Sequence, residues 1–131
     1  MATAHSALQN HLLAALPRSE YDRLLGDLEL IAMPLGEGLY ESGSQLGHVY
    51  FPTTCIVSLL YVMEDGASAE IAVVGNEGII GVALFMGGET TPSRAVVQSA
   101  GHAYRLKGQL LKREFTRSAG MQHLRRWIHG A

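Results

Sequence analysis

The sequence contains a single cysteine, Cys55, among its 131 residues. One cysteine excludes an internal disulfide, and it excludes an iron–sulfur site built from four cysteines of one chain. No apolar run approaches the roughly 20 residues that a membrane-spanning helix needs. The first residues also lack the basic flank and the apolar core of a signal peptide. We therefore expect a cytoplasmic protein that folds without disulfides, with Cys55 as a small buried residue of a strand.

Basic side chains are scarce in the first two thirds of the chain. Arg18 and Arg23 are the only ones before Arg94, against eleven acidic residues. From Arg94 onward there are eight lysines or arginines and one acidic residue, Glu114, although the net charge of the whole chain is only −2. This asymmetry would suit a nucleic acid or an acidic partner near the C-terminus. We favour the simpler interpretation that the basic tail packs on the acidic body.

Apolar residues at helical spacing predict two helices at the start of the chain. The first covers residues 6–16, with Ser6 as its cap and Pro17 as its end. The second runs from Ser19 to Asp27, with Ser19 as its N-cap. The residues expected to face inward are Leu8, Leu12, Ala15, Leu16, Tyr21, Leu24, Leu25 and Leu28.

From residue 28 the pattern changes to short apolar segments separated by glycine turns. Strands are expected at residues 28–35, 39–41, 48–51, 56–63, 67–74, 94–98 and 102–106. Asp65-Gly66 is a strong hairpin signal, because glycine adopts the positive φ that a tight turn requires. The last two strands are expected to pair with each other around residues 99–101. The pattern indicates an all-β sandwich or roll rather than alternating strands and helices.

The chain is organised around the glycine-rich stretch at residues 75–97, which reads GNEGIIGVALFMGGETTPSRAVV. It predicts a tight turn, one helical turn after Gly81, a polar loop, and a strand that begins near Arg94. The free amide groups at the start of a short helix and a nearby arginine can together hold an anion. Residues 75–97 are therefore the candidate binding cassette.

The order of these parts resembles the phosphate-binding cassette of cyclic-nucleotide-binding domains, above all the sensor domain of the Crp/Fnr transcription regulators. Residues 36–43, 48–51, 64–66 and 78–81 support the resemblance, which covers about residues 8–128. It implies a mainly β fold with flanking helices, a double-stranded β-helix or jelly roll of the cyclic-nucleotide-binding-domain type. Residues 1–131 would form one domain, with N-terminal helices at 1–27, a β-roll at 28–106 and C-terminal helices at 107–131.

The resemblance also implies where a ligand would bind. In the nucleotide-binding members, a Gly-Glu pair opens the short helix and the glutamate binds the ribose hydroxyl, while an arginine followed by Ser or Thr and then Ala pairs with the cyclic phosphate. The candidate ligand-binding residues of this chain are Gly81, Val82, Ala83, Leu84, Ser93, Arg94 and Ala95.

Two of these positions depart from the family's pattern. Val82 follows Gly81, so no carboxylate stands at the place of the glutamate, and the order Ser93-Arg94 is exchanged. In a strand, a shift by one residue turns a side chain to the opposite face. We therefore expect that the domain does not bind cyclic AMP in the family's usual way, and that any small-molecule effector is a different compound.

The C-terminal segment predicts further helix from residue 107. Its candidate dimer residues are Met121, Leu124, Trp127 and Ile128. In the family that the chain resembles, the corresponding helix is long, pairs two subunits and leads to a helix-turn-helix DNA-binding domain. About one and a half heptads are too few for a stable coiled coil, so we expect a monomer or a weak homodimer. We expect DNA binding only through a helix-turn-helix domain that this chain does not contain, and no membrane partner.

The leading functional hypothesis is an effector-sensing domain of a Crp/Fnr-like transcription regulator, without catalytic activity or cofactor. The alternatives are a cyclic-nucleotide-binding module with a divergent cassette, and a ligand-free dimerisation or interaction module whose interior is filled by Met63, Phe85 and Met86. A cupin-like metalloenzyme is least favoured. The histidines include no pair separated by one residue, as metal sites on such rolls require, and the sequence has no Gly-x-Ser-x-Gly motif. No metal site is expected.

Overall fold

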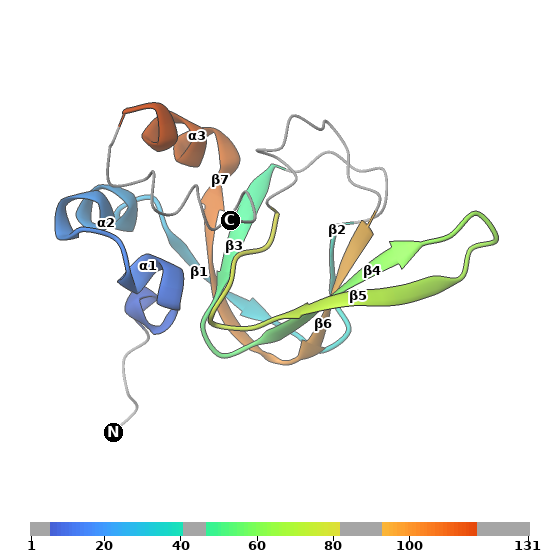
Figure 1. The fold of residues 1–131 in the computed structure, drawn as a ribbon. Coiled ribbons are helices and arrows are strands. Elements are labelled where there is room, and N and C mark those ends of the chain that lie inside the picture. Colours follow the sequence, from blue (N-terminus) through green and yellow to red (C-terminus); the bar gives the residue numbers. More distant parts are fainter. Residues whose placement is uncertain (1–5, 41–46, 82–92, 118–131) are drawn as a thin grey trace, which may run out of the picture.

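A computed structural model describes residues 6–40, 47–81 and 93–117 and shows antiparallel sheets with helices gathered at one side (Figure 1). The N-terminal helices are a short 3-10 helix (Ala7–Gln9), α1 (His11–Ala14) and α2 (Arg18–Leu25). Helix α3 (Gly108–Arg117) follows the last strand directly and lies on the same side as α2 (Figure 1).

The strands form two sheets. They are β1 (Glu29–Met33), β2 (Gly38–Tyr40), β3 (His48–Pro52), β4 (Ile56–Val62), β5 (Ser68–Val74), β6 (Ser93–Ser99) and β7 (Gly101–Lys107). One sheet has the order β1-β7-β3, and the other has the order β2-β6-β4-β5. The hairpin of β4 and β5 extends away from the helices (Figure 1) and turns at Gly66, whose φ is +88°. The predicted mainly β roll with flanking helices is confirmed.

The predicted pairing of residues 94–98 with 102–106 is wrong. Strand β6 pairs with β2 and β4, whereas β7 pairs with β1 and β3 in the other sheet. The cause is the contact of Gly101 with the chain before β4. A Cβ atom at Gly101 would lie only 2.5 Å from the carbonyl carbon of Thr54, and the carbonyl oxygen of His102 accepts from the amide groups of Thr53 and Thr54. These contacts direct the chain into the second sheet.

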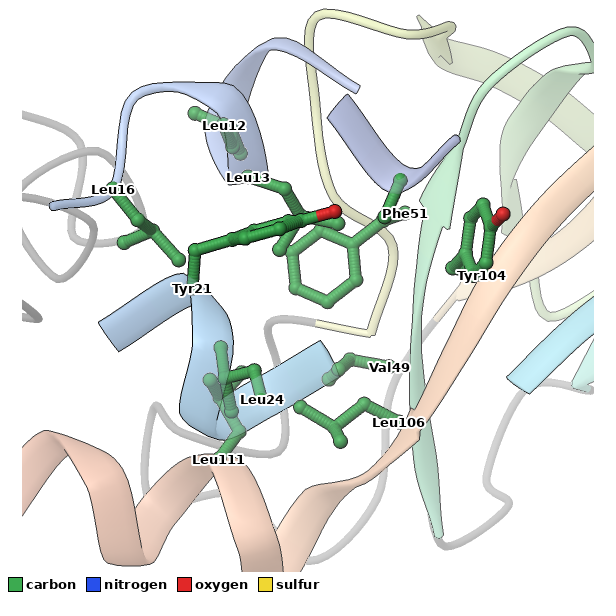
Figure 2. Packing of buried hydrophobic residues seen from close by; sticks show 11 residues of the cluster. Leu12, Leu13, Leu16, Tyr21, Leu24, Val49, Phe51, Tyr104, Leu106 and Leu111 are labelled. Carbon is green, nitrogen blue, oxygen red and sulfur yellow. The ribbon is translucent and has the colours of Figure 1, made fainter. Parts of the chain in front are cut away.

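The sheet β1-β7-β3 separates two apolar cores. The helical core brings together the N-terminal helices, β3, β7 and α3 (Figure 2). It consists of Ala7, Leu12, Leu13, Leu16, Tyr21, Leu24, Val49, Phe51, Tyr104, Leu106 and Leu111. The roll core consists of Met33, Cys55, Val57, Ile80, Ala95, Val97 and Ala103. Cys55 is buried as predicted, although it immediately precedes β4 rather than lying within it, and burial raises the pKa of its thiol.

The N-terminal helices differ from the sequence prediction in three ways. Asn10 interrupts the expected helix of residues 6–16, because its side chain is the N-cap of α1 and accepts from the amide groups of Leu12 and Leu13. Helix α2 begins at Arg18 rather than after a cap at Ser19. Leu8, Ala15 and Leu25, which were expected to face inward, are exposed.

Asn10 also ties the helices to the roll. Its Nδ2 donates to the carbonyl oxygen atoms of Pro52 and Gly78, each at 2.9 Å, and the residue is fully buried. Pro52 ends β3, and Gly78 lies in the turn at the start of the candidate cassette. One side chain therefore holds together α1, β3 and the start of the cassette.

Replacing Asn10 by alanine should lower the free energy of unfolding by about 3 kcal/mol, because it removes a helix cap and takes the Asn10 donor away from one buried and one partly buried carbonyl group. Equilibrium unfolding in urea measures this loss. The matched control is Gln9→Ala, an exposed neighbour that takes part in a capping box with Ser6; we expect it to cost less than about 1 kcal/mol. Equal losses in the two variants would contradict the role given to Asn10.

An ion pair joins α2 to α3. Arg23 Nε donates to Glu114 Oε1 at 2.9 Å, and Glu20 lies one helical turn from Arg23. Glu114 is buried, and its hydrogen bond to Arg23 raises the pKa of the guanidinium. A pocket of about 160 Å³ beside this pair is lined by Arg23, Leu24, Asp27, Leu110, Arg113 and Glu114. The lining of this pocket contains two arginines, Arg23 and Arg113, and two acidic residues, Asp27 and Glu114, so its formal charges balance.

A double-mutant cycle with Arg23→Gln and Glu114→Gln should give a clearly positive coupling energy in urea unfolding, because one partner of the pair is buried. The matched control is the ion pair Arg18–Asp22, in which Nε and Oδ1 lie 3.1 Å apart. Its side chains are 86% and 53% exposed. We expect its coupling to be close to zero. Comparable coupling in both pairs would show that Arg23 and Glu114 do not hold α3.

Candidate ligand-binding site

Within the candidate cassette, the chain makes a tight bend at Gly81, which we call the glycine corner. Ile80 and Tyr50 exchange two backbone hydrogen bonds of 2.9 Å each, which place the chain beside β3. The next residue, Gly81, is buried and has a φ of +101°. A Cβ atom there would lie 2.9 Å from the carbonyl oxygen of His48. Glycine is therefore required at this position both by the backbone conformation and by the close approach of β3.

Strand β6 supplies the other half of the candidate site. Ala95 and Val97 are fully buried in the roll core. Ala95 lies opposite Leu59, which packs against the same core, and Arg94 lies opposite Leu60. Because side chains alternate along a strand, Arg94 starts from the face of the sheet opposite to Ala95. The structure thus places Ala95 in the roll core and Arg94 on the other face of the sheet.

The outer face of the sheet β2-β6-β4-β5, which is the face away from the roll core, carries a polar cluster. Arg94 lies on this face. Leu60 pairs with Arg94 on one side and with Glu70 on the other, so that Arg94 and Glu70 flank Leu60 on one face. On the same face, the hydroxyl of Ser58 donates to Glu70 Oε1 at 2.7 Å and lies 2.9 Å from Gln98 Oε1. The Nε atom of Arg94 is itself buried. This environment is polar, whereas the roll core is formed by apolar side chains.

Several predicted residues lie outside the described parts of the chain. These are Val82, Ala83 and Leu84 of the cassette, Phe85 and Met86, and the candidate dimer residues Met121, Leu124, Trp127 and Ile128. Ser93 is described only by its backbone, which pairs with Tyr61 of β4. Among the residues described, no group of three or more His, Cys, Asp or Glu side chains could hold a metal ion. Within the same ranges, none of the helices has the length and apolarity to cross a membrane.

His48, the first residue of β3, is a site feature that sequence analysis treated only as part of a strand. Its carbonyl oxygen contacts the glycine corner, and its imidazole has a lowered pKa. Burial is the main cause, the positive charges of Arg105 and Lys107 add to it, and Glu29 opposes it. The charged imidazolium is therefore less favoured in the folded protein than in the unfolded chain.

This shift makes stability depend on pH. Below the ordinary histidine pKa of 6.5, the unfolded chain binds a proton at His48 more readily than the folded protein does, so stability falls as the pH is lowered through that range. We expect His48→Gln to remove a small part, on the order of 1–2 °C, of the Tm decrease between pH 7 and pH 5. Thermal melts at both pH values test this, with exposed His11→Gln as control; an unchanged decrease in His48→Gln would contradict it.

The sequence of residues 30–118 matches the family of cyclic nucleotide-binding domains. The chain therefore belongs to the cyclic nucleotide-binding domain family, in agreement with the two-sheet roll and the glycine corner. No curated protein matches the chain in sequence.

Several solved structures have the same fold, and some of them are named as parts of transcriptional regulators. The N-terminal domain of a transcriptional regulator from Streptomyces coelicolor A3(2) aligns with a TM-score of 0.72 and 22% identity, over 95% of this chain and 91% of that one. The sensor domain of the transcriptional regulator DNR from Pseudomonas aeruginosa aligns with a TM-score of 0.73 and 16% identity, over 93% and 85%. The catabolite activator protein of Thermus thermophilus aligns at 0.72 and 18%, over 90% of this chain but 58% of its own. The fold is that of Crp/Fnr-type sensor domains.

Proposed function

We propose that this chain is the effector-sensing domain of a Crp/Fnr-like transcription regulator, working in the cytoplasm without catalytic activity of its own. We further propose that it does not hold cyclic AMP by the family's pairing of an arginine with the cyclic phosphate. The observation that carries this second part is the register of β6. Leu59 lies opposite Ala95 at the roll core, so Arg94 belongs to the other face of the sheet.

The electrostatics of the described residues support the same proposal. A cyclic phosphate carries a full negative charge, and burying it without a charged or well-aligned donor is unfavourable. The roll core side chains around Ala95 and Ile80 are apolar, and Arg94 shares its face with the polar cluster of Ser58, Glu70 and Gln98. An uncharged or largely apolar effector would suit such an interior better than a phosphate does.

A ligand-free interaction module is the second candidate, because one feature favours it. The described side chains of the roll core fill it: Met33, Cys55, Val57, Ile80 and Val97 are all nearly inaccessible to solvent. Met63, which was expected to fill the interior, is instead 44% exposed, and Phe85 and Met86 lie outside the described residues. On this view the roll would act as a rigid scaffold for the helices, and a partner domain would supply any DNA binding. A homodimer through the C-terminal segment would fit either function.

Calorimetric titration with cyclic AMP and cyclic GMP tests the proposal. We expect no binding by the natural chain up to about millimolar nucleotide, because losing a hydrogen bond to a charged group costs about 1.5–3 kcal/mol, or roughly tenfold to a hundredfold in affinity. The double variant Ser93→Arg/Arg94→Ser restores the family's order and should move a guanidinium to the inner face. It should therefore bind at least about tenfold more tightly than the natural chain.

Arg94→Ser alone is the matched control, since it removes the guanidinium from the outer face without adding one inside. Its affinity should equal that of the natural chain, and thermal melts should show that all variants are folded. Micromolar binding by the natural chain that disappears in Arg94→Ser would show that Arg94 does reach a phosphate, and the proposal would be wrong.

A further inference from the structure

The pocket between α2 and α3 lies apart from the candidate cassette and carries charges of both signs. It has a volume of about 160 Å³, and its lining comes from α2, the turn after α2, and α3. We infer that this pocket is a second ligand site, which binds a free α-amino acid with a short aliphatic side chain. The inference does not rest on the proposed sensor function, because it uses no residue of the cassette or of the roll core.

The base of the pocket is apolar. Leu24 of α2 is only 1% exposed, and Leu110 of α3 packs partly buried against the same helical core. Behind the pocket, Leu24 and Leu111 lie between the two helices (Figure 2). A cavity of about 150 Å³ holds a molecule of the size of benzene. The pocket is therefore large enough for the aliphatic part of a small amino acid, and its base has the matching chemistry.

The walls of the pocket carry two arginines and two acidic residues. Leu110, Arg113 and Glu114 are spaced i, i+3 and i+4, so they share one face of α3. Across the pocket from this face stand Arg23 and Asp27. Each side of the pocket thus contributes one positive and one negative side chain.

These charged residues have two different roles. Arg23 Nε donates to the buried Glu114 at 2.9 Å, and Arg23 also lies 3.5 Å from Glu20 Oε1, so this group fixes the spacing of the helices. Asp27 and Arg113 are exposed and stand where the pocket opens to solvent. An arginine has five N–H donors, so Arg113 can bind a ligand and keep a contact within the protein at the same time.

An α-amino acid matches this arrangement of groups. Its carboxylate can accept two parallel hydrogen bonds from the guanidinium of Arg113, and its ammonium group can donate to Asp27. Because the formal charges of the lining balance, a ligand of one sign would meet like and opposite charges equally, whereas a zwitterion can place each charge against its opposite. The aliphatic side chain then covers Leu24 and Leu110 and removes apolar surface from water.

NMR titration of the natural chain with L-alanine, L-valine and L-leucine tests the inference. We expect saturable shifts of the amide signals of Leu24, Asp27 and Leu110 for at least one of the three, with a Kd on the order of 1 mM, since a ligand of so few atoms has little binding free energy. Absence of such shifts with all three amino acids up to about 20 mM would overturn the inference.

Two analogues of valine test the recognition of both charges in the natural chain. Isovalerate lacks the amino group and isobutylamine lacks the carboxylate, and each should bind at least about tenfold more weakly than valine. Glycine has both charges without the side chain and should also bind more weakly, because it leaves the leucines of the base uncovered. If isovalerate or isobutylamine bound as tightly as valine, the site would not be one for amino acids.

Substitutions at the mouth of the pocket assign the site to its residues. Asp27→Asn and Arg113→Gln should each weaken binding by about tenfold or more, and since both side chains are exposed, thermal melts should show that the variants remain folded. Asp22→Asn and Arg18→Gln are the matched controls, because they remove the same charges from an exposed ion pair outside the pocket. Equal affinities in all four variants would overturn the inference. The nucleotide titrations concern the roll, so the outcome of neither experiment decides the other.

Discussion

The burial of both faces of β3 is the constraint on which the rest of the structure depends. Val49 and Phe51 of β3 lie in the helical core, while Tyr50 between them packs against the roll core. A strand that is held from both sides has little freedom to shift, because interiors are close-packed. His48, the first residue of β3, and Gly47 before it are therefore positioned firmly. The glycine corner lies against His48, and the first residue of α3 donates to the carbonyl oxygen of Gly47.

Much of the fold follows from local patterns in the sequence. Asp65-Gly66 predicts the hairpin of β4 and β5 because only a few residues adopt the positive φ of that turn, and the structure confirms it. The sequence pattern does not show which strands pair with each other, because the alternation of apolar and polar residues shows only that a segment is extended. The assignment of β6 and β7 to different sheets depends on the contact of Gly101 with Thr54 and Cys55, which are far away in the sequence.

Asn10 shows the same limit of prediction from the sequence: its local role can be predicted, but its distant contacts cannot. Asn is a favoured N-cap, and Asn10 stands two residues before the buried pair Leu12-Leu13, so a break in the helix could have been predicted from the sequence. Its two bonds to Pro52 and Gly78 could not, since they join segments separated by more than forty residues. In the candidate site, the order Ser93-Arg94 predicts that the arginine lies on the face opposite to the roll core, and this stays a prediction, while the contact of Gly81 with His48 required the structure.

The glycine corner and Arg94 bear on two different properties of this domain. The corner concerns its fold, and Arg94 concerns its choice of ligand. Gly81 is needed for its φ and for the approach of His48, whether or not a ligand is present, so the glycine pattern reports the fold. Arg94 has no such role in the roll core, and on our proposal its place one residue along β6 leaves a buried phosphate without a positive charge. A chain can therefore keep the corner, the two cores and the attachment of α3 while losing the recognition of one anion, because stability and ligand choice depend on different residues.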